Sequence, residues 1–463
     1  MLLRTLRIRD LKLLRDVTID FTSADGGVRP WTVFIGRNGT GKTSVLQAIA
    51  LAAAGTTGAG LLSQNIREQL PDVRRPKVQV SIDAEFEFGP IGRTFPDVHP
   101  YFKAAAPDQV PKGLRAALSF PRGDDPVRGR SWYTNEQPPT RTVATADDDP
   151  LVRARQDNLS LWFVAGYGLS RLLPERQFKS EEERPPRPSI DRLRPLFEPE
   201  RLIGPNFADV LATPLKLEFA RLLRRMVQAS NGLVPGIVDL ETAGRSMTGG
   251  GGVLSGRDML ERHRFTERLG GATQKLPATW FAHGHQSTLA WLTDLVGQVL
   301  LEASTTVDPE HMEGLVLIDE IDLYLHPTWQ VGFIRALRET FPKLQFIATT
   351  HSPILLTGLS RDEVLVLSRD PETGDVRAER PQHDPRLLTG SELYEYFFEI
   401  DELYPTDLGR KLDEYSRLAA NPYRTDREDL RVDQLYQELS SEGIPPARTK
   451  TPRKILKGGG ARG

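Results

Sequence analysis

The residues with the clearest chemical meaning form a glycine-rich segment near the N-terminus. The segment Gly-Arg-Asn-Gly-Thr-Gly-Lys-Thr follows an apolar run, Trp31–Ile35, and precedes a helical pattern. Glycines let consecutive backbone N–H groups face one phosphate, and the N-terminus of the following helix adds partial positive charge. In such a loop the lysine reaches the β and γ phosphates and the threonine hydroxyl holds Mg²⁺. The residues expected to bind Mg-ATP are Gly36, Arg37, Asn38, Gly39, Thr40, Gly41, Lys42, Thr43 and Ser44.

A second motif is an apolar strand that ends in two carboxylates, Leu-Val-Leu-Ile-Asp-Glu at Leu315–Glu320. A buried central strand would deliver Asp319 to the metal, and Glu320 would orient and deprotonate the attacking water. Many α/β proteins have a strand that simply ends in a charged turn. The glycine loop favours the catalytic interpretation.

A third motif is Phe-Ile-Ala-Thr-Thr-His-Ser-Pro at Phe346–Pro353. It predicts a strand that ends near His351, and ligands bind at the carboxyl ends of strands in parallel sheets. A lone histidine is more often structural. Its place one helix after Asp319 and Glu320 favours a hydrogen bond from His351 to the γ-phosphate, so we count it as a catalytic candidate.

Composition limits the classes of protein that the chain could represent. Its 463 residues allow two or three compact units, and 60 Lys and Arg balance 62 Asp and Glu, so no global charge attracts nucleic acid or membrane. It has no cysteine, which excludes disulfides and thiolate metal sites. We expect no signal peptide and no segment approaching the ~20 apolar residues of a membrane span. A cytoplasmic protein without membrane contact is the expectation.

The elements that must position these motifs indicate an α/β fold with a mixed sheet. Alternation of apolar residues predicts a half-buried antiparallel strand over Val78–Phe88, whereas 107–150 reads as loop-dominated. Helices are expected from Ser44, over Leu289–Ala303 and over Thr328–Thr340. The expected organisation is an ATPase lobe over 1–180, a mainly helical insert over 181–275, a second ATPase lobe over 276–385, a helical C-terminal extension over 386–445 and a basic flexible tail over 446–463.

These motifs, in this order, resemble the RecF/SMC-like branch of ABC ATPases, and especially bacterial AAA-type ATPases with OLD-like or "virulence-associated" ATP-binding domains. The opening 21 residues, Val-Ala-Gly-Tyr-Gly-Leu-Ser-Arg at Val164–Arg171 and Asp-Glu-Ile-Asp-Leu-Tyr-Leu-His-Pro at Asp319–Pro327 carry the resemblance. It implies an ABC-type P-loop NTPase head that binds ATP and Mg²⁺. It also implies a homodimer in which two heads enclose ATP and each presents a signature motif to the other's nucleotide.

The signature motif is the point at which the chain departs from this family. It corresponds to Phe-Ala-His-Gly-His-Gln-Ser-Thr, and the family's serine falls at Ala282, which has no hydroxyl group. The resemblance leaves Gly284 and the following helix N-terminus to meet the partner's γ-phosphate. Slow turnover and substitution for the serine by His283, His285 or Ser287 are both open. Asp322 resembles the D-loop acid that contacts the opposite head, and its alternative role is a cap close to a helix. A metal site at His283 and His285 is disfavoured because the sequence offers no third ligand.

Two basic features allow more than one interpretation. Arg171 either approaches the nucleotide or contacts its base, or it is a surface arginine. The C-terminal tail either touches DNA phosphates or is a solvated terminus. Its basic residues are Lys450, Arg453, Lys454, Lys457 and Arg462.

The function expected from these features is an ATPase head that controls a separate effector, such as a nuclease, in DNA repair or other DNA metabolism, or in anti-phage defence, with DNA as a further candidate partner. An OLD-type nuclease is the alternative, but it needs an Asp-x-Asp pair on an apolar strand after the ATPase. No such pair follows His351. A transporter ATPase is disfavoured by the degenerate signature and the long insert.

Overall fold

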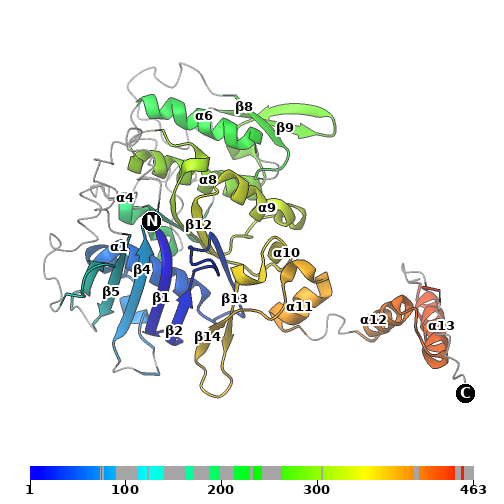
Figure 1. The fold of residues 1–463 in the computed structure, drawn as a ribbon. Helices are drawn as coiled ribbons and strands as arrows, with labels where there is room; N and C mark the ends of the chain where they lie inside the picture. The colour runs from blue at the N-terminus through cyan, green and yellow to red at the C-terminus, as the bar shows by residue number, and fades with distance from the viewer. Residues whose placement is uncertain are drawn as a thin grey trace, which may run out of the picture. The chain divides into compact units, whose positions relative to one another are not determined.

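The computed structural model divides the chain into two compact units, 1–388 and 389–463, which are described separately (Figure 1). The described residues are 1–72, 74–75, 78–89, 112–121, 125–139, 163–171, 188–198, 213–229, 233–241, 263–303, 306–400, 406–443 and 450–452.

The strands of the first unit form three sheets. Their order is β14-β13-β3-β12-β11-β7 in the largest, β2-β1-β4-β5-β6 in the second and β10-β9-β8 in the third. The strand bounds are β1 Leu2–Leu11, β2 Leu14–Asp20, β3 Trp31–Ile35, β4 Val80–Glu87, β5 Gly113–Phe120, β6 Arg128–Tyr133, β7 Val164–Tyr167, β8 Ile237–Glu241, β9 Arg264–Leu269, β10 Ala272–Leu276, β11 Gly314–Ile318, β12 Leu344–Thr349, β13 Val364–Arg369 and β14 Val376–Glu379.

The helices of both units are also labelled in chain order. The α-helices are α1 Lys42–Leu62, α4 Pro188–Asp191, α6 Thr213–Ala229, α8 His283–Ala303, α9 Pro327–Thr340, α10 Pro353–Leu356, α11 Gly390–Phe398, α12 Asp407–Ala420 and α13 Asp426–Ser441. The 3₁₀ helices are η1 Arg67–Gln69, η4 Arg194–Leu196, η6 Ala278–Trp280, η7 Pro309–His311, η8 Arg361–Glu363 and η9 Pro385–Leu387.

The largest sheet is the one that positions the sequence motifs. Strands β13, β3, β12, β11 and β7 run parallel, and β14 pairs antiparallel at one edge. Every residue of β3, β11 and β12 is buried, which explains why these strands read as continuous apolar runs. The predicted α/β fold with a mixed sheet is confirmed.

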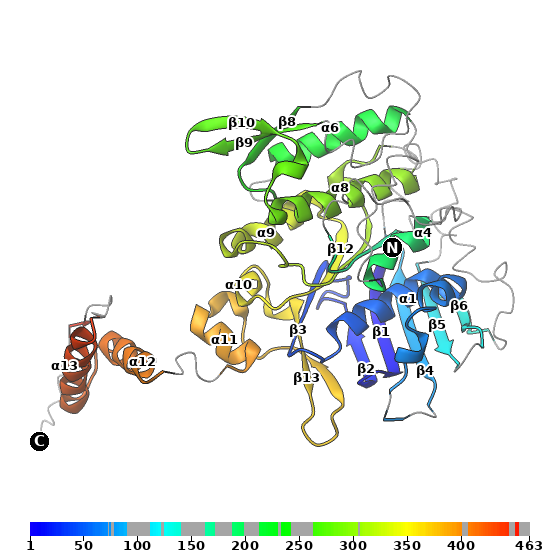
Figure 2. The ribbon, with the colours of Figure 1, turned by 180° about the vertical axis from the view of Figure 1, so that it is seen from behind.

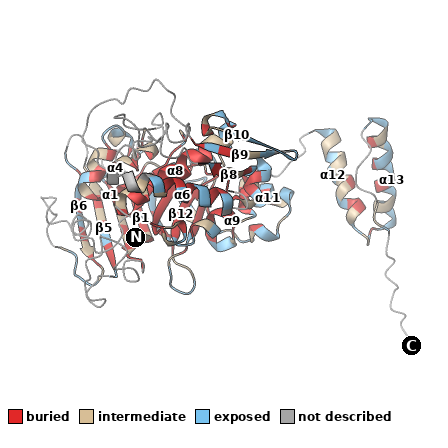
Figure 3. Cartoon of the chain, turned by 90° about the horizontal axis from the view of Figure 1, so that it is seen from above, coloured by how far each residue is buried: buried red, intermediate tan, exposed pale blue. Residues whose placement is uncertain are grey.

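Helix α1 packs against both the largest sheet and the antiparallel sheet that contains β4, β5 and β6. It contacts β4, β5 and β6 on one side and β12, β11 and β7 on another (Figure 2). Its length and composition would allow it to cross a membrane, so the expectation that no segment has these properties is wrong. However, 78% of its most apolar window is buried, as in the core helix of an α/β protein (Figure 3).

Several expected elements are confirmed, and β4 shows the clearest pattern. Alternate residues of β4 are buried along its whole length, as the period-two pattern predicted. The sequence did not predict the strands β5 and β6, which lie within 107–150; β5 pairs with both β4 and β6.

The described residues of the insert expected over 181–275 are not all helical, and the expectation of a mainly helical insert stays a prediction. The insert contains α6, but also β8, β9 and most of β10, which form an antiparallel sheet. The sequence did not indicate β10, because most of its residues are exposed and apolar residues do not alternate with polar ones along it. In addition, Ile190, Leu193 and Leu196 belong to the main hydrophobic core, so 188–198 packs with the ATPase lobe.

The second unit is helical, as expected. Helices α12 and α13 pack through a small core of Tyr415, Leu418, Ala419, Val432, Leu435 and Leu439. Lys450, which we expected in the flexible tail, donates to Asp433 at 2.7 Å and lies 3.2 Å from Asp429. It therefore belongs to this helix pair, whereas the other tail cations lie outside the described residues.

Candidate nucleotide site

The glycine loop adopts the backbone conformation that its glycines predict. Gly36, Gly39 and Gly41 all have positive φ, at 147°, 79° and 89°. A Cβ atom at Gly36 would lie 2.3 Å from the carbonyl oxygen of Leu367 in β13, so no larger residue fits there. The loop thus passes closely over the sheet before α1 begins at Lys42.

Lys42 points back into this loop. Only 8% of the residue is exposed, and its Nζ donates to the carbonyl oxygens of Gly36 at 2.7 Å and Arg37 at 3.2 Å. Burial lowers its pKa, although the negative charges of Asp319 and Glu320 act in the opposite direction. The ammonium is therefore held where it can exchange these carbonyls for phosphate oxygens.

The two sequence motifs meet at Asp319, which ends the β11 strand. Its Oδ2 accepts a hydrogen bond from Thr43 at 2.8 Å, and its Oδ1 accepts one from Thr349 at 2.6 Å. Hydroxyl and carboxylate oxygens are the ligands that Mg²⁺ prefers. Thr43 and Asp319 therefore fit the metal site that the sequence predicted.

Glu320 follows in an unusual backbone conformation. Its φ is 48°, in the left-handed region that non-glycine residues rarely adopt, and its N–H donates to the Thr349 hydroxyl at 2.7 Å. Its half-buried carboxylate makes no hydrogen bond with any described residue. This backbone turn keeps the carboxylate of Glu320 separate from that of Asp319 and leaves it available for a water molecule.

His351 lies just after β12, the strand between β3 and β11. The residue is half-buried, and its ring has no hydrogen-bond partner among the described residues. The neighbouring Thr349 already contacts Asp319. His351 thus follows the strand that lies between β3, which precedes the glycine loop, and β11, which precedes Asp319 and Glu320.

The signature-like residues lie at the start of α8, against the turn that follows Glu320. A Cβ atom at Gly284 would be 2.5 Å from the carbonyl oxygen of Tyr324. Ala282 and His283 are exposed, and the described hydrogen bonds of Lys42 go to Gly36 and Arg37. Among the described residues, no hydrogen bond therefore joins Gly284 to Lys42 within one chain.

Of the two histidines beside Gly284, His285 has structural partners. His285 Nε2 lies 3.0 Å from the carbonyl oxygen of Pro235, and its ring packs between Phe281 and Trp329. Within the described part of the chain, no third metal ligand is grouped with His283 and His285. The expectation of no metal here therefore stays a prediction.

Asp322, the expected D-loop acid, contacts the segment that carries His351. It accepts a hydrogen bond from the Thr350 hydroxyl at 2.5 Å. A second link joins the same two segments, because Ser352 Oγ donates to Gln330 at 2.5 Å and Gln330 donates to the carbonyl oxygen of Leu325 at 2.8 Å. The D-loop and the histidine segment are thus held together within one chain.

Arg171 is the residue whose place the sequence predicted least well. It is 1% exposed, so the surface interpretation is wrong. Its guanidinium donates to the carbonyl oxygens of Asp319 and Glu320. The strand pairing of β7 with β11 brings them together, and no local sequence signal reports that pairing.

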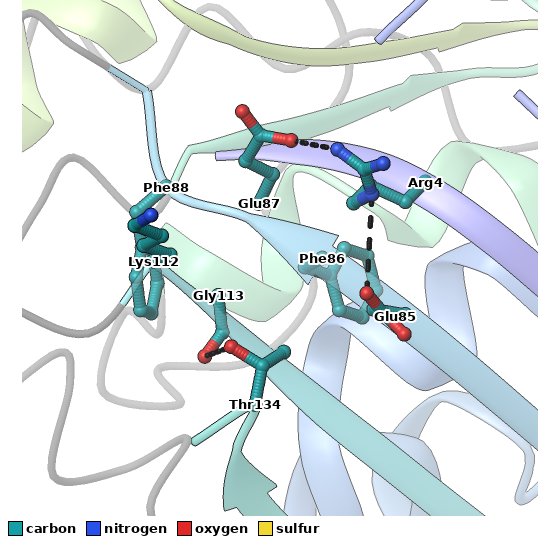
Figure 4. Close-up of a pocket in the computed structure, with 8 residues that line it drawn as sticks. All are labelled: Arg4, Glu85, Phe86, Glu87, Phe88, Lys112, Gly113 and Thr134. Carbon is teal, nitrogen blue, oxygen red and sulfur yellow. Dashed lines mark hydrogen bonds and ion pairs between the residues drawn. The ribbon is translucent and has the colours of Figure 1, made fainter. Parts of the chain in front are cut away.

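A described cavity lies elsewhere, in the antiparallel sheet. It has a volume of about 580 Å³ and is lined by strand ends of the antiparallel sheet, with Arg4 close to Glu85 and Glu87 (Figure 4). None of the glycine-loop residues lines it. The nucleotide site is therefore a set of strand ends and an open loop rather than this cavity.

The strand order explains why these groups meet. Strands β3 and β11 flank β12, all three are parallel, and each of the three motifs follows one of them. Ligands bind at the carboxyl ends of parallel strands, where this loop, carboxylate pair and histidine lie. Together with the antiparallel sheet beyond α1, this arrangement defines a P-loop NTPase head of the ABC type.

Residues 31–357 match the family described as "AAA domain, putative AbiEii toxin, Type IV TA system", and the chain belongs to this family. It is similar to the Septu protein PtuA of Bacillus mycoides (strain KBAB4), with 26% identity over 440 residues, 94% of this chain and 50% of that protein. It is also 33% identical over 138 residues to the retron Ec83 probable ATPase of Escherichia coli, over 30% of this chain and 24% of that protein. The chain thus spans about half the length of the Septu relative.

Among solved structures, the chain is similar to the SMC head bound to the C-winged helix domain of ScpA. The identity is 12%, the TM-score is 0.48, and the match covers 82% of this chain and 98% of that one.

Proposed function

We propose that the chain binds and hydrolyses ATP. The observation that carries this proposal is the 2.8 Å hydrogen bond between Thr43 and Asp319, which joins the glycine loop to the acidic strand end across 276 residues. The family supports it, and so does the name of the retron relative, a probable ATPase.

Each residue of the site has a proposed role. The backbone N–H groups of the glycine loop and Lys42 bind the phosphates, and Thr43 and Asp319 hold Mg²⁺. Bound Mg²⁺ supplies positive charge that offsets the negative charge of the phosphates. Glu320 accepts the proton of the attacking water, and His351 donates to the γ-phosphate.

The site within one chain is incomplete under this proposal. Among the described residues, Gly284 packs against Tyr324 and Asp322 accepts from Thr350, and neither has a hydrogen bond to the chain's own glycine loop. We therefore propose that two copies meet head to head, so that each copy's Gly284 and Asp322 face the partner's nucleotide. Because Ala282 donates no hydrogen bond, hydrolysis is expected to be slow.

The biological role that we propose is anti-phage defence in the cytoplasm, with the ATP-bound dimer controlling a separate protein effector such as a nuclease. The Septu and retron names of the relatives support this role, whereas DNA metabolism has no such support. Because the chain spans half of the Septu relative, the effector and any DNA contact are part of the proposal.

Phosphate release from Mg-ATP by the purified chain tests the activity. Wild type and Lys343→Ala, an exposed lysine outside the site, should release phosphate, and Glu320→Gln should release it only at a small residual rate. Equal release by Glu320→Gln would contradict the assignment. Isolation of the chain from its host with and without ATP tests the effector, since the partner should be absent from Lys42→Ala preparations.

The same preparations test the nuclease alternative. The isolated chain should not cut DNA with Mg²⁺ or Mn²⁺, because no acidic cluster on a strand follows His351 in the sequence. Cleavage that survives Lys42→Ala would support an OLD-type nuclease instead.

A further inference from the structure

Arg171 is a buried cation whose hydrogen bonds go to backbone carbonyls. It follows β7, and its guanidinium donates to the carbonyl oxygens of Gly168 at 3.2 Å, Glu320 at 2.6 Å and Asp319. No carboxylate of the described chain lies within ion-pair distance of it. Arg171 thus binds the backbone carbonyl groups of Asp319 and Glu320, the two residues that carry the acidic side chains.

Burying a guanidinium in this way is unfavourable unless its donors are satisfied. Burial lowers the pKa of Arg171 to about 10, and the nearby carboxylates of Asp319, Asp322 and Glu320 act in the opposite direction. A neutral apolar residue would avoid this desolvation. The arginine therefore needs an explanation beyond packing.

The backbone of Glu320 supplies that explanation. Its left-handed conformation costs of order 1–3 kcal/mol and persists only where the surroundings hold it. Thr349 accepts from its N–H, and Arg171 donates to its carbonyl oxygen, so both of its peptide groups are fixed. The carboxylate makes no hydrogen bond with a described residue.

We propose that Arg171 is a positioning residue for hydrolysis, which holds the turn at Asp319 and Glu320 so that the Glu320 carboxylate faces the attacking water. This inference rests on the proposed function, because it acts through Glu320 as the base. It predicts that Arg171 affects the hydrolytic step and leaves ATP binding largely unchanged.

The variant Arg171→Lys separates these effects. Lysine keeps the positive charge but lacks the planar fork that serves two carbonyls at once. We expect kcat to fall roughly tenfold to a hundredfold, as for a small displacement of a catalytic group, while KM and the Kd of a fluorescent ATP analogue stay within about twofold. Loss of affinity in proportion to kcat, or an unchanged kcat, would overturn the proposal.

Arg192 provides a control in the same strand region, although it differs from Arg171 in forming an ion pair with Glu302 at 2.7 Å. It is also buried, and it donates to the carbonyl oxygen of Val164 at 2.6 Å, at the other end of β7. Arg192→Lys should lower the melting temperature as Arg171→Lys does, but leave kcat within about twofold. Equal losses of kcat in both variants would mean that general destabilisation is the cause.

A double variant tests the route through Glu320. If Arg171 acts by placing that carboxylate, Arg171→Lys adds no further loss to Glu320→Gln, because effects on one group are not additive. Losses that multiply would overturn the proposal. If Arg171→Lys fails to fold, Arg171→Gln, which keeps one amide donor, takes its place.

The outcomes also separate the two proposals. If Glu320→Gln hydrolyses ATP like wild type, the proposed function fails, and the inference about Arg171 fails with it. If Glu320→Gln is inactive and Arg171→Lys is not impaired, only the inference about Arg171 fails.

Discussion

Lys42 supplies the side-chain positive charge of the glycine loop, and it already lies among backbone carbonyls that phosphate oxygens can replace. A hydrogen bond to a charged group contributes roughly 1.5–3 kcal/mol. We therefore predict that Lys42→Ala lowers ATP affinity about tenfold to a hundredfold by isothermal titration. Lys343→Ala should bind as wild type does. Wild-type affinity in Lys42→Ala would contradict the loop as the phosphate site.

Asp294 is a buried carboxyl group that the proposed chemistry does not use. Tyr167 donates to it at 2.9 Å, and Gln298 donates at 3.3 Å. Burial raises its pKa to about 7, against the ordinary 3.8 of the unfolded chain. Between these values the folded protein keeps a proton that the unfolded chain has lost, so stability falls as pH rises.

The variant Asp294→Asn should remove this pH dependence, because an amide imitates the protonated carboxyl group. Relative to wild type, its free energy of unfolding should rise between pH 4 and 7 by up to about 1.4 kcal/mol per pH unit and level off above pH 7. Chemical denaturation at several pH values measures this. The buried Gln298 Oε1, which has no partner, can accept from the new amide after a flip of its own.

Asp384 provides the control for this experiment. Its pKa is lowered to about 2, mainly by hydrogen bonds from Arg386, so its contribution to stability is lost only as pH falls below about 4. Asp384→Asn should therefore differ from wild type by a constant amount between pH 5 and 8. A constant difference for Asp294→Asn as well would contradict a raised pKa.

At the scale of elements, the contact between α8 and the turn after Glu320 depends on Gly284. A Cβ atom there would lie 2.5 Å from the Tyr324 carbonyl oxygen, so Gly284→Ala must push the helix and the turn apart. Overpacking of this kind costs about 1–3 kcal/mol. We predict a lower melting temperature and slower phosphate release.

Gly332, within α9, is the matched control. A Cβ atom there meets nothing within 4 Å, and its φ is not positive. Gly332→Ala should therefore raise the free energy of unfolding by about 0.5–1 kcal/mol, as alanine does in a helix interior. A Gly284→Ala protein as stable and active as Gly332→Ala would mean that α8 and the turn are not in contact.

The elements around the nucleotide site could be predicted because their signals are local. Strands β3 and β11 are buried on both faces and read as apolar runs, and the glycine loop matches a phosphate-binding pattern made of consecutive residues. By contrast, β10 is mostly exposed, and its residues carry no alternation. The contacts of Arg171 could not be predicted. The pairing of β7 with β11 brings Arg171 to Asp319, which lies 148 residues away in the sequence. Local sequence patterns do not report such pairing.

At the scale of the whole molecule, no hydrogen bond between described residues of the first unit joins Lys42 to Gly284. Under the proposed function, ATP therefore joins two copies, and a chain that binds ATP without hydrolysing it should accumulate as the closed dimer by mass action. Glu320→Gln keeps the shape of the side chain and removes the base.

We predict that Glu320→Gln with Mg-ATP has a larger mass by light scattering than the same protein with ADP, whereas Lys42→Ala shows no ATP-dependent change. If the C-terminal helices already hold two copies together, the mass stays constant but small-angle scattering detects the closure, because the heads come together around ATP. If neither mass nor shape responds to ATP in Glu320→Gln, the heads do not enclose the nucleotide. The resemblance to ABC ATPases would then extend to nucleotide binding but not to assembly, and Gly284 would act only as the packing contact with Tyr324 that the structure gives it.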